Sequence, residues 1–169
     1  MCLGGILSHE RNWQFCSPFV NLAIPADEFV RLVNNLEVDV NGNFEDITND
    51  SPYPIGLLAG KYHIAFIHYK SFNEAVTIWR KRAQRINFNN VYIILVQTET
   101  CSTQGLSDFD LLKYKKKIAL VAEDSTTTET RFPIRGYDGK NTKGEILSPV
   151  GYFGQHLYDQ FNWGHFFNK

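Results

Sequence analysis

The residues best suited to chemistry begin at position 68. His68-Tyr69-Lys70-Ser71 joins an apolar run to a helical pattern, so we expect a strand-to-helix turn there. Ligands of open α/β sheets bind near such turns, where helix N-termini present unpaired N–H groups. His68 is therefore a candidate catalytic base, with Tyr69, Lys70 and Ser71 as substrate contacts. The alternative, that His68 ends a strand and bonds a neighbouring backbone group, stays open.

Arginines follow at positions 80, 82 and 85. Arg82 borders the apolar stripe of the expected helix, and Arg85 lies beside it one turn later. Because guanidinium groups bind carboxylates and phosphates through paired hydrogen bonds, Arg82 and Arg85 are candidate substrate contacts. Cations in the last turns of a helix also stabilise it through the helix dipole, which accounts for the same residues without any ligand.

A second candidate site is Cys2-Leu3-Gly4-Gly5 at the start of the chain. A turn at Gly4 and Gly5 would let backbone N–H groups approach a substrate, and the Cys2 thiolate would be the nucleophile. His9 or His68 would activate that thiol. The alternative is a buried, unreactive cysteine, since free cysteines are among the most buried residues. We expect His68, Arg82 and the Gly4-Gly5 turn to converge on one concave surface.

Two segments carry the clearest structural signals. Ser71 and Glu74 form a capping-box pattern that opens a helix, and Trp79 falls on its apolar stripe, which predicts that Trp79 belongs to the core. The unbroken apolar run from Val91 to Val96 predicts a central strand covered on both faces.

The other elements follow from apolar periodicity and turn residues. Strands are expected near 19–24, 55–58, 62–68, 117–122 and 131–134, and helices near 26–37, 107–114 and 158–167. Strands that alternate with helices predict an α/β fold, with a mostly parallel or mixed central sheet flanked by helices. No linker divides the 169 residues, so a single α/β domain over 1–169 is expected.

Composition excludes several classes of function. The net charge of −1 disfavours nucleic acid as a partner, and no apolar run approaches the ~20 residues of a transmembrane segment. No signal peptide is visible, and Cys2, Cys16 and Cys101 lack paired spacing, which predicts reduced thiols in a cytoplasmic protein and no metal site. Dinucleotide, P-loop, serine-hydrolase and zinc-protease motifs are missing, and the cofactor is unknown.

Several stretches in order along the chain together resemble a bacterial family called domain of unknown function nineteen-nineteen. They are Cys2-Leu3-Gly4-Gly5, Ser17-Pro18-Phe19, Tyr53-Pro54-Ile55-Gly56, His68-Tyr69-Lys70-Ser71, Trp79-Arg80-Lys81-Arg82, Arg85-Ile86-Asn87, Phe109-Asp110-Leu111-Leu112-Lys113-Tyr114-Lys115 and Tyr158-Asp159-Gln160-Phe161. Similar proteins carry a strand before the cysteine-glycine motif, which this chain is expected to lack.

The resemblance implies a role in surface-polysaccharide (exopolysaccharide or capsule) biosynthesis, because members of the family are labelled in that way. We expect a transferase acting on an anionic or sugar-nucleotide substrate, with a sugar or sugar phosphate as ligand and other enzymes of the pathway as partners. The alternative is a non-catalytic module that binds a carbohydrate or a partner enzyme and regulates the same pathway.

Overall fold

A computed structural model describes residues 3–141, 144–150 and 154–168. The chain divides into two compact units, Met1–Val91 and Tyr92–Lys169. Each unit contains one three-stranded sheet with helices, so the predicted α/β class is confirmed. The assignment of 1–169 to a single domain stays a prediction. None of the described helices is both long and apolar enough to cross a bilayer.

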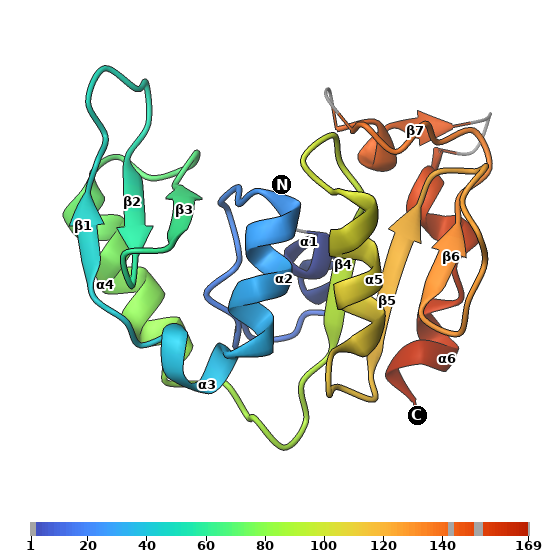
Figure 1. The fold of residues 1–169 in the computed structure, drawn as a ribbon, viewed down its shortest axis with the longest axis horizontal. Helices are drawn as coiled ribbons and strands as arrows, with labels where there is room; N and C mark the ends of the chain where they lie inside the picture. The colour runs from blue at the N-terminus through green and yellow to red at the C-terminus, as the bar shows by residue number, and fades with distance from the viewer. Residues whose placement is uncertain (1–2, 142–143, 151–153, 169) are drawn as a thin grey trace. The chain divides into compact units, whose positions relative to one another are not determined.

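The first unit is built on an antiparallel sheet, whose strands Figure 1 shows side by side in the order β1-β2-β3. The hairpin between β2 and β3 turns at Ala59 and Gly60, both with positive φ, and the Lys61 N–H closes the turn on the Leu58 carbonyl at 3.0 Å. The elements of this unit are α1 (Leu3–Glu10), α2 (Ala26–Asn34), α3 (Leu36–Asp39), β1 (Phe44–Asp46), β2 (Ile55–Leu58), β3 (Tyr62–Ala65) and α4 (Phe72–Ala83).

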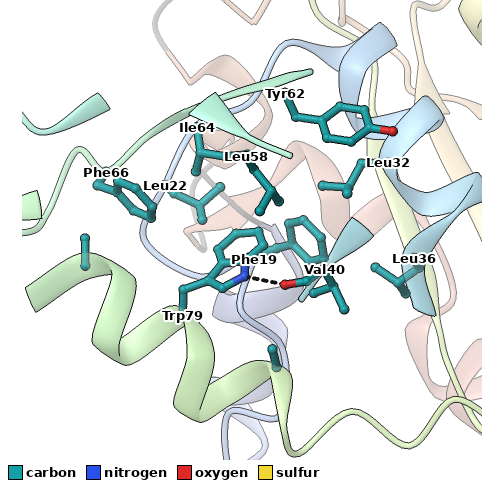
Figure 2. Close-up of a cluster of buried hydrophobic side chains, with 12 residues drawn as sticks. Phe19, Leu22, Leu32, Leu36, Val40, Leu58, Tyr62, Ile64, Phe66 and Trp79 are labelled. Carbon is teal, nitrogen blue, oxygen red and sulfur yellow. Dashed lines mark hydrogen bonds between the residues drawn. The ribbon is translucent and has the colours of Figure 1, made fainter. Parts of the chain in front are cut away.

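One side of α4 forms the core of this unit together with the sheet (Figure 2). Trp79 is 2% exposed and its Nε1 donates to the Val40 carbonyl at 2.9 Å, which confirms its predicted place in the core. The Ser71 half of the predicted capping box is confirmed, because the Ser71 Oγ accepts the Glu74 N–H at 3.3 Å. The Glu74 carboxylate reaches back one residue further than expected, to the Lys70 N–H at 3.2 Å.

Three predicted elements of this unit need correction. The strand expected at 19–24 is only a bridge, in which Ala23 and Ala65 exchange backbone hydrogen bonds. The helix expected over 26–37 breaks at Asn35, whose φ of −116° interrupts it between α2 and α3. The strand expected to reach His68 ends at Ala65, so His68 lies in a turn that follows an antiparallel strand.

A buried hydrogen bond joins α3 to the hairpin. The Tyr62 hydroxyl donates to the Asp39 carboxylate at 2.6 Å, and Asp39 is 4% exposed. Burial, the hydrogen bond to Asp39 and its negative charge together raise the pKa of Tyr62 to about 12. The phenol therefore keeps its proton in the folded state at pH values where an unfolded chain loses it.

This hydrogen bond predicts a specific loss of stability at alkaline pH. The unfolded tyrosine titrates near pH 10.0 and the folded one near 12, so the free energy of unfolding should fall as pH rises between those values. Tyr62→Phe should show a shallower fall, with a cost of about 1–3 kcal/mol at pH 7 because Asp39 loses its donor. Urea unfolding at pH 7 to 11.5 measures both. Equal slopes for the two proteins would contradict the assignment.

The second unit is built on a parallel sheet of order β4-β5-β6, and Figure 1 shows α5 lying along it. Every residue of β5 is buried. The elements are β4 (Ile93–Val96), α5 (Thr103–Leu111), β5 (Lys117–Val121), β6 (Arg131–Pro133), η1 (Glu145–Leu147), β7 (Pro149–Val150), β8 (Gln155–His156), η2 (Leu157–Gln160) and α6 (Trp163–Phe167).

The prediction that Val91 to Val96 forms the central strand is wrong in one respect. β4 lies at the edge of the described sheet and β5 lies at its centre. The side chains of β4 alternate between buried and half-buried, so both of its faces are substantially covered. An unbroken apolar run indicates that both faces of a strand are covered. It does not indicate whether the strand has a hydrogen-bonded neighbour on each edge.

Candidate functional site

The two arginines selected from the sequence meet on one irregular segment of the first unit. Arg82 Nη1 donates to the Val20 carbonyl at 3.3 Å and to the Tyr69 hydroxyl at 2.9 Å. Arg85 Nη1 donates to the Phe15 carbonyl at 3.1 Å. We call Phe15, Val20, Tyr69, Arg82 and Arg85 the arginine cluster.

Phe15 contacts both guanidinium groups. The Arg82 guanidinium carbon lies 5.4 Å from the centroid of the Phe15 ring, within the range of a cation–π interaction. Arg85 Nη1 donates to the main-chain carbonyl of the same residue. The backbone N–H of Arg85 donates to the backbone carbonyl of Arg82 at 3.0 Å, so the two arginines belong to the same turn at the end of α4. Two cations are thus held against one residue.

Tyr69 connects this pair to the turn at 68–71. Its hydroxyl accepts from Arg82 and donates to the Val20 carbonyl at 3.2 Å. Burial raises the pKa of Tyr69 above its ordinary value, although the positive charge and hydrogen bond of Arg82 oppose part of that rise. Tyr69 is therefore a neutral phenol that fixes Arg82 in place.

No carboxylate pairs with Arg82 or Arg85 within the described part of the chain. Both side chains are half-buried, and among the described residues their guanidinium groups contact two carbonyls, one hydroxyl and one ring. A guanidinium has five N–H donors, and an ionised acceptor bonds them about twice as strongly as a neutral one. The cluster is therefore suited to an anion, which would also reduce the repulsion between the two cations.

The other residues predicted at 68–71 have different surroundings. His68 is exposed, and among the described residues its ring has no hydrogen-bond partner. Lys70 is exposed, and both its N–H and the Ser71 hydroxyl serve to cap α4. The rule that places ligands at the carboxyl edge of a parallel sheet does not apply here, since β3 is antiparallel to β2.

The predicted turn at Gly4 and Gly5 is wrong, because both glycines lie in the first turns of α1. Leu3 and Leu7 bury one face of this helix, which outweighs the poor helix propensity of glycine. A Cβ on Gly5 would lie 3.1 Å from Cγ1 of Val20, so the glycine permits close packing. The Gly4 carbonyl accepts a hydrogen bond from the Ser8 hydroxyl at 2.8 Å. Cys2 lies outside the described residues.

The expected convergence of His68, Arg82 and the two glycines on one concave surface stays a prediction, but Gly5 and Arg82 both contact Val20. Gly5 packs against its side chain, while Arg82 and Tyr69 bind its carbonyl. His68 is next to Tyr69 in sequence, but its exposed ring takes no part in these contacts. Sequence reasoning missed Phe15 and Val20, which contribute main-chain carbonyls that any residue type could supply. The spacing of Arg11, Trp13 and Phe15, a cation followed by alternating aromatics, was the one available signal.

Side-chain hydrogen bonds join the strand ends at the carboxyl edge of the parallel sheet. The Tyr137 hydroxyl donates to the Gln97 carbonyl, and the Gln97 side chain accepts the Ala122 N–H at 2.9 Å. Burial raises the pKa of Tyr137, and the charges of Asp138 and Glu145 add to the rise, so it stays a neutral donor. Among the residues the structure describes, no three His, Cys, Asp or Glu side chains gather to hold a metal ion.

Comparisons with known proteins cover almost the whole chain. The family described as Domain of unknown function (DUF1919) matches residues 1–168. An uncharacterized protein of Haemophilus influenzae is 29% identical over 167 residues, which are 99% of this chain and 81% of that protein.

Proposed function

The chain belongs to the DUF1919 family, and from the arginine cluster we propose that it binds a sugar nucleotide or a similar anionic sugar derivative in surface-polysaccharide biosynthesis. The observation that carries this proposal is the pair Arg82 and Arg85, two half-buried cations that no described carboxylate neutralises. A diphosphate supplies two adjacent anionic groups for two guanidinium groups. Arg85, whose guanidinium makes one hydrogen bond within the described part of the chain, provides the main ligand contact, and Arg82 is a positioning residue.

A transferase reaction is the proposed use of this site. The bond between the sugar's anomeric carbon and the phosphate would break, the nucleoside diphosphate would leave, and an acceptor hydroxyl would bond to that carbon. His68, exposed beside Tyr69, is the candidate base for the acceptor's proton. Cys16 and Cys101 form no disulfide, which fits the proposed cytoplasmic location.

Thermal unfolding with pyrophosphate and with a panel of nucleoside-diphosphate sugars tests the binding step. A ligand at 100 times its dissociation constant stabilises the folded state by about 2.7 kcal/mol. Arg85→Gln should abolish this stabilisation, whereas Lys81→Gln, an exposed cation at the same end of α4, should retain it. Stabilisation that is equal in wild type and Arg85→Gln, or absent from wild type, would refute the proposal.

Variants of Arg82 and His68 distinguish a residue that positions the site from a residue that acts in the reaction. Arg82→Ala should destabilise the protein by about 1.5–3 kcal/mol, because the Val20 carbonyl and Tyr69 lose a charged donor. His68→Ala should leave stability within about 0.5 kcal/mol. Release of nucleoside diphosphate from a bound sugar nucleotide that depends on His68 would support a transferase. Binding without release would instead favour the non-catalytic module.

A further inference from the structure

Beside the arginine cluster, the irregular segment after α1 exposes an aromatic side chain. Trp13 is 48% exposed, whereas Trp79 and Trp163 are 2% and 6% exposed. The Arg11 guanidinium lies 5.6 Å from the centroid of the Trp13 ring. A large aromatic side chain that is half exposed does not serve mainly to pack the core, so we ask which other groups lie near it.

Main-chain contacts fix where Trp13 stands. The Trp13 N–H donates to the Ser8 carbonyl at 2.9 Å, and the Asn12 N–H donates to the His9 carbonyl at 3.0 Å. Asn12 has a φ of 53°, which asparagine tolerates better than most residues, and the chain reverses there at the end of α1. The backbone therefore fixes where the Trp13 side chain starts, and about half of the residue remains exposed beside the Arg11 guanidinium.

Trp13 is separated from the site of Arg85 by a very short length of chain. Phe15, whose carbonyl accepts from Arg85 and whose ring contacts Arg82, is two residues further on. Two residues span at most about 7 Å. An exposed aromatic side chain and the residue that holds two guanidinium groups thus lie on one short segment, and such combinations bind bases by stacking while the cations bind the phosphates.

We propose that the ligand of the arginine cluster is a nucleoside diphosphate whose base stacks on Trp13 while its phosphates bind at Arg85. This inference rests on the proposed function, because it states where the base of the same ligand binds. Stacking is the step that distinguishes a nucleotide from free pyrophosphate or a sugar phosphate. Trp13 is then a specificity residue, and Arg85 supplies binding that all these anions share.

The intrinsic fluorescence of the full chain provides the test, because Trp13 is far more exposed than the other two tryptophans. Uridine diphosphate, pyrophosphate and glucose 1-phosphate are titrated against wild type, Trp13→Ala and Trp13→Phe, with thermal unfolding as a second readout. We expect uridine diphosphate to change the emission of wild type and pyrophosphate to bind without doing so. Trp13→Ala should weaken uridine diphosphate binding about 5- to 150-fold and leave pyrophosphate binding unchanged.

The controls separate this inference from the function on which it rests. Trp13→Phe should restore most of the affinity, and Val38→Ala, which removes a 76% exposed side chain elsewhere in the unit, should have no effect. Equal uridine diphosphate binding by wild type and Trp13→Ala would overturn the inference and leave the anion site standing. Glucose 1-phosphate bound as tightly as uridine diphosphate would overturn the assignment of the base. Failure of all three ligands to bind would refute both proposals.

Discussion

Trp79→Ala is expected to destabilise the protein by about 3–5 kcal/mol. The indole lies within the buried cluster that Figure 2 shows and is the largest fully buried side chain among the described residues. It packs edge-to-face against Phe19 and Phe44 with centroid distances of 5.2 and 5.3 Å. Its removal leaves a cavity in the core, and it also leaves the Val40 carbonyl without its donor. Urea unfolding followed by circular dichroism measures the loss.

Two variants separate cavity from hydrogen bond. Trp79→Phe keeps an aromatic ring and loses the N–H, so its cost should be smaller than that of alanine. Lys81→Ala changes an exposed side chain of the same helix and should stay within about 0.5 kcal/mol of wild type. A cost below 1 kcal/mol for Trp79→Ala would contradict the place of this residue in the core.

Asp110→Ala is expected to cost about 2–4 kcal/mol, the second largest effect. One carboxylate oxygen lies 2.6 Å from Arg131 Nη2, and the other accepts from the Thr130 hydroxyl at 2.5 Å and from Arg131 Nε at 3.3 Å. These contacts fasten the end of α5 to the start of β6. Without the carboxylate, the Arg131 side chain, 13% exposed, remains a partly buried cation with no counter-charge.

The neighbouring carboxylate on α5 is a matched control for this prediction. Asp108 is exposed and accepts only from the Gln104 amide at 2.8 Å in the same helix, so Asp108→Ala should change stability by less than about 0.5 kcal/mol. Combining Asp110→Leu with Arg131→Met should cost less than the sum of the two single changes. Strict additivity would show that the two side chains do not stabilise each other.

Local signals predicted the start of α4 better than the arrangement of the strands. The start of α4 followed from Ser71 and Glu74 because a capping box is completed within four residues. The partner of a strand is decided far along the chain, and an apolar run carries no information about it. The run at Ile93–Val96 therefore identified a strand correctly but could not show that β5 would be the one with neighbours on both sides.

In the candidate site too, side chains could be selected from the sequence, but their main-chain partners could not. Arg82, Arg85 and Tyr69 were selected by residue type, and the structure brings all three together. Their partners at Phe15 and Val20 are carbonyls, which every residue possesses, so no side-chain pattern could predict them. Gly5 was selected for a turn, but its absent side chain instead lets Val20 pack closely.

The division of the chain at Val91 has a consequence for how the protein is made. All the residues that make the contacts within Met1–Val91 are synthesised before the ribosome translates the codons for Tyr92–Lys169. At ~5–20 residues per second the nascent first unit has roughly 4 to 16 seconds to fold before its successor is finished. A ribosome stalled beyond codon 91, far enough for that unit to leave the exit tunnel, should thus carry an antiparallel sheet already resistant to protease. The parallel sheet, whose strands are joined by longer excursions of the chain, would form only after release.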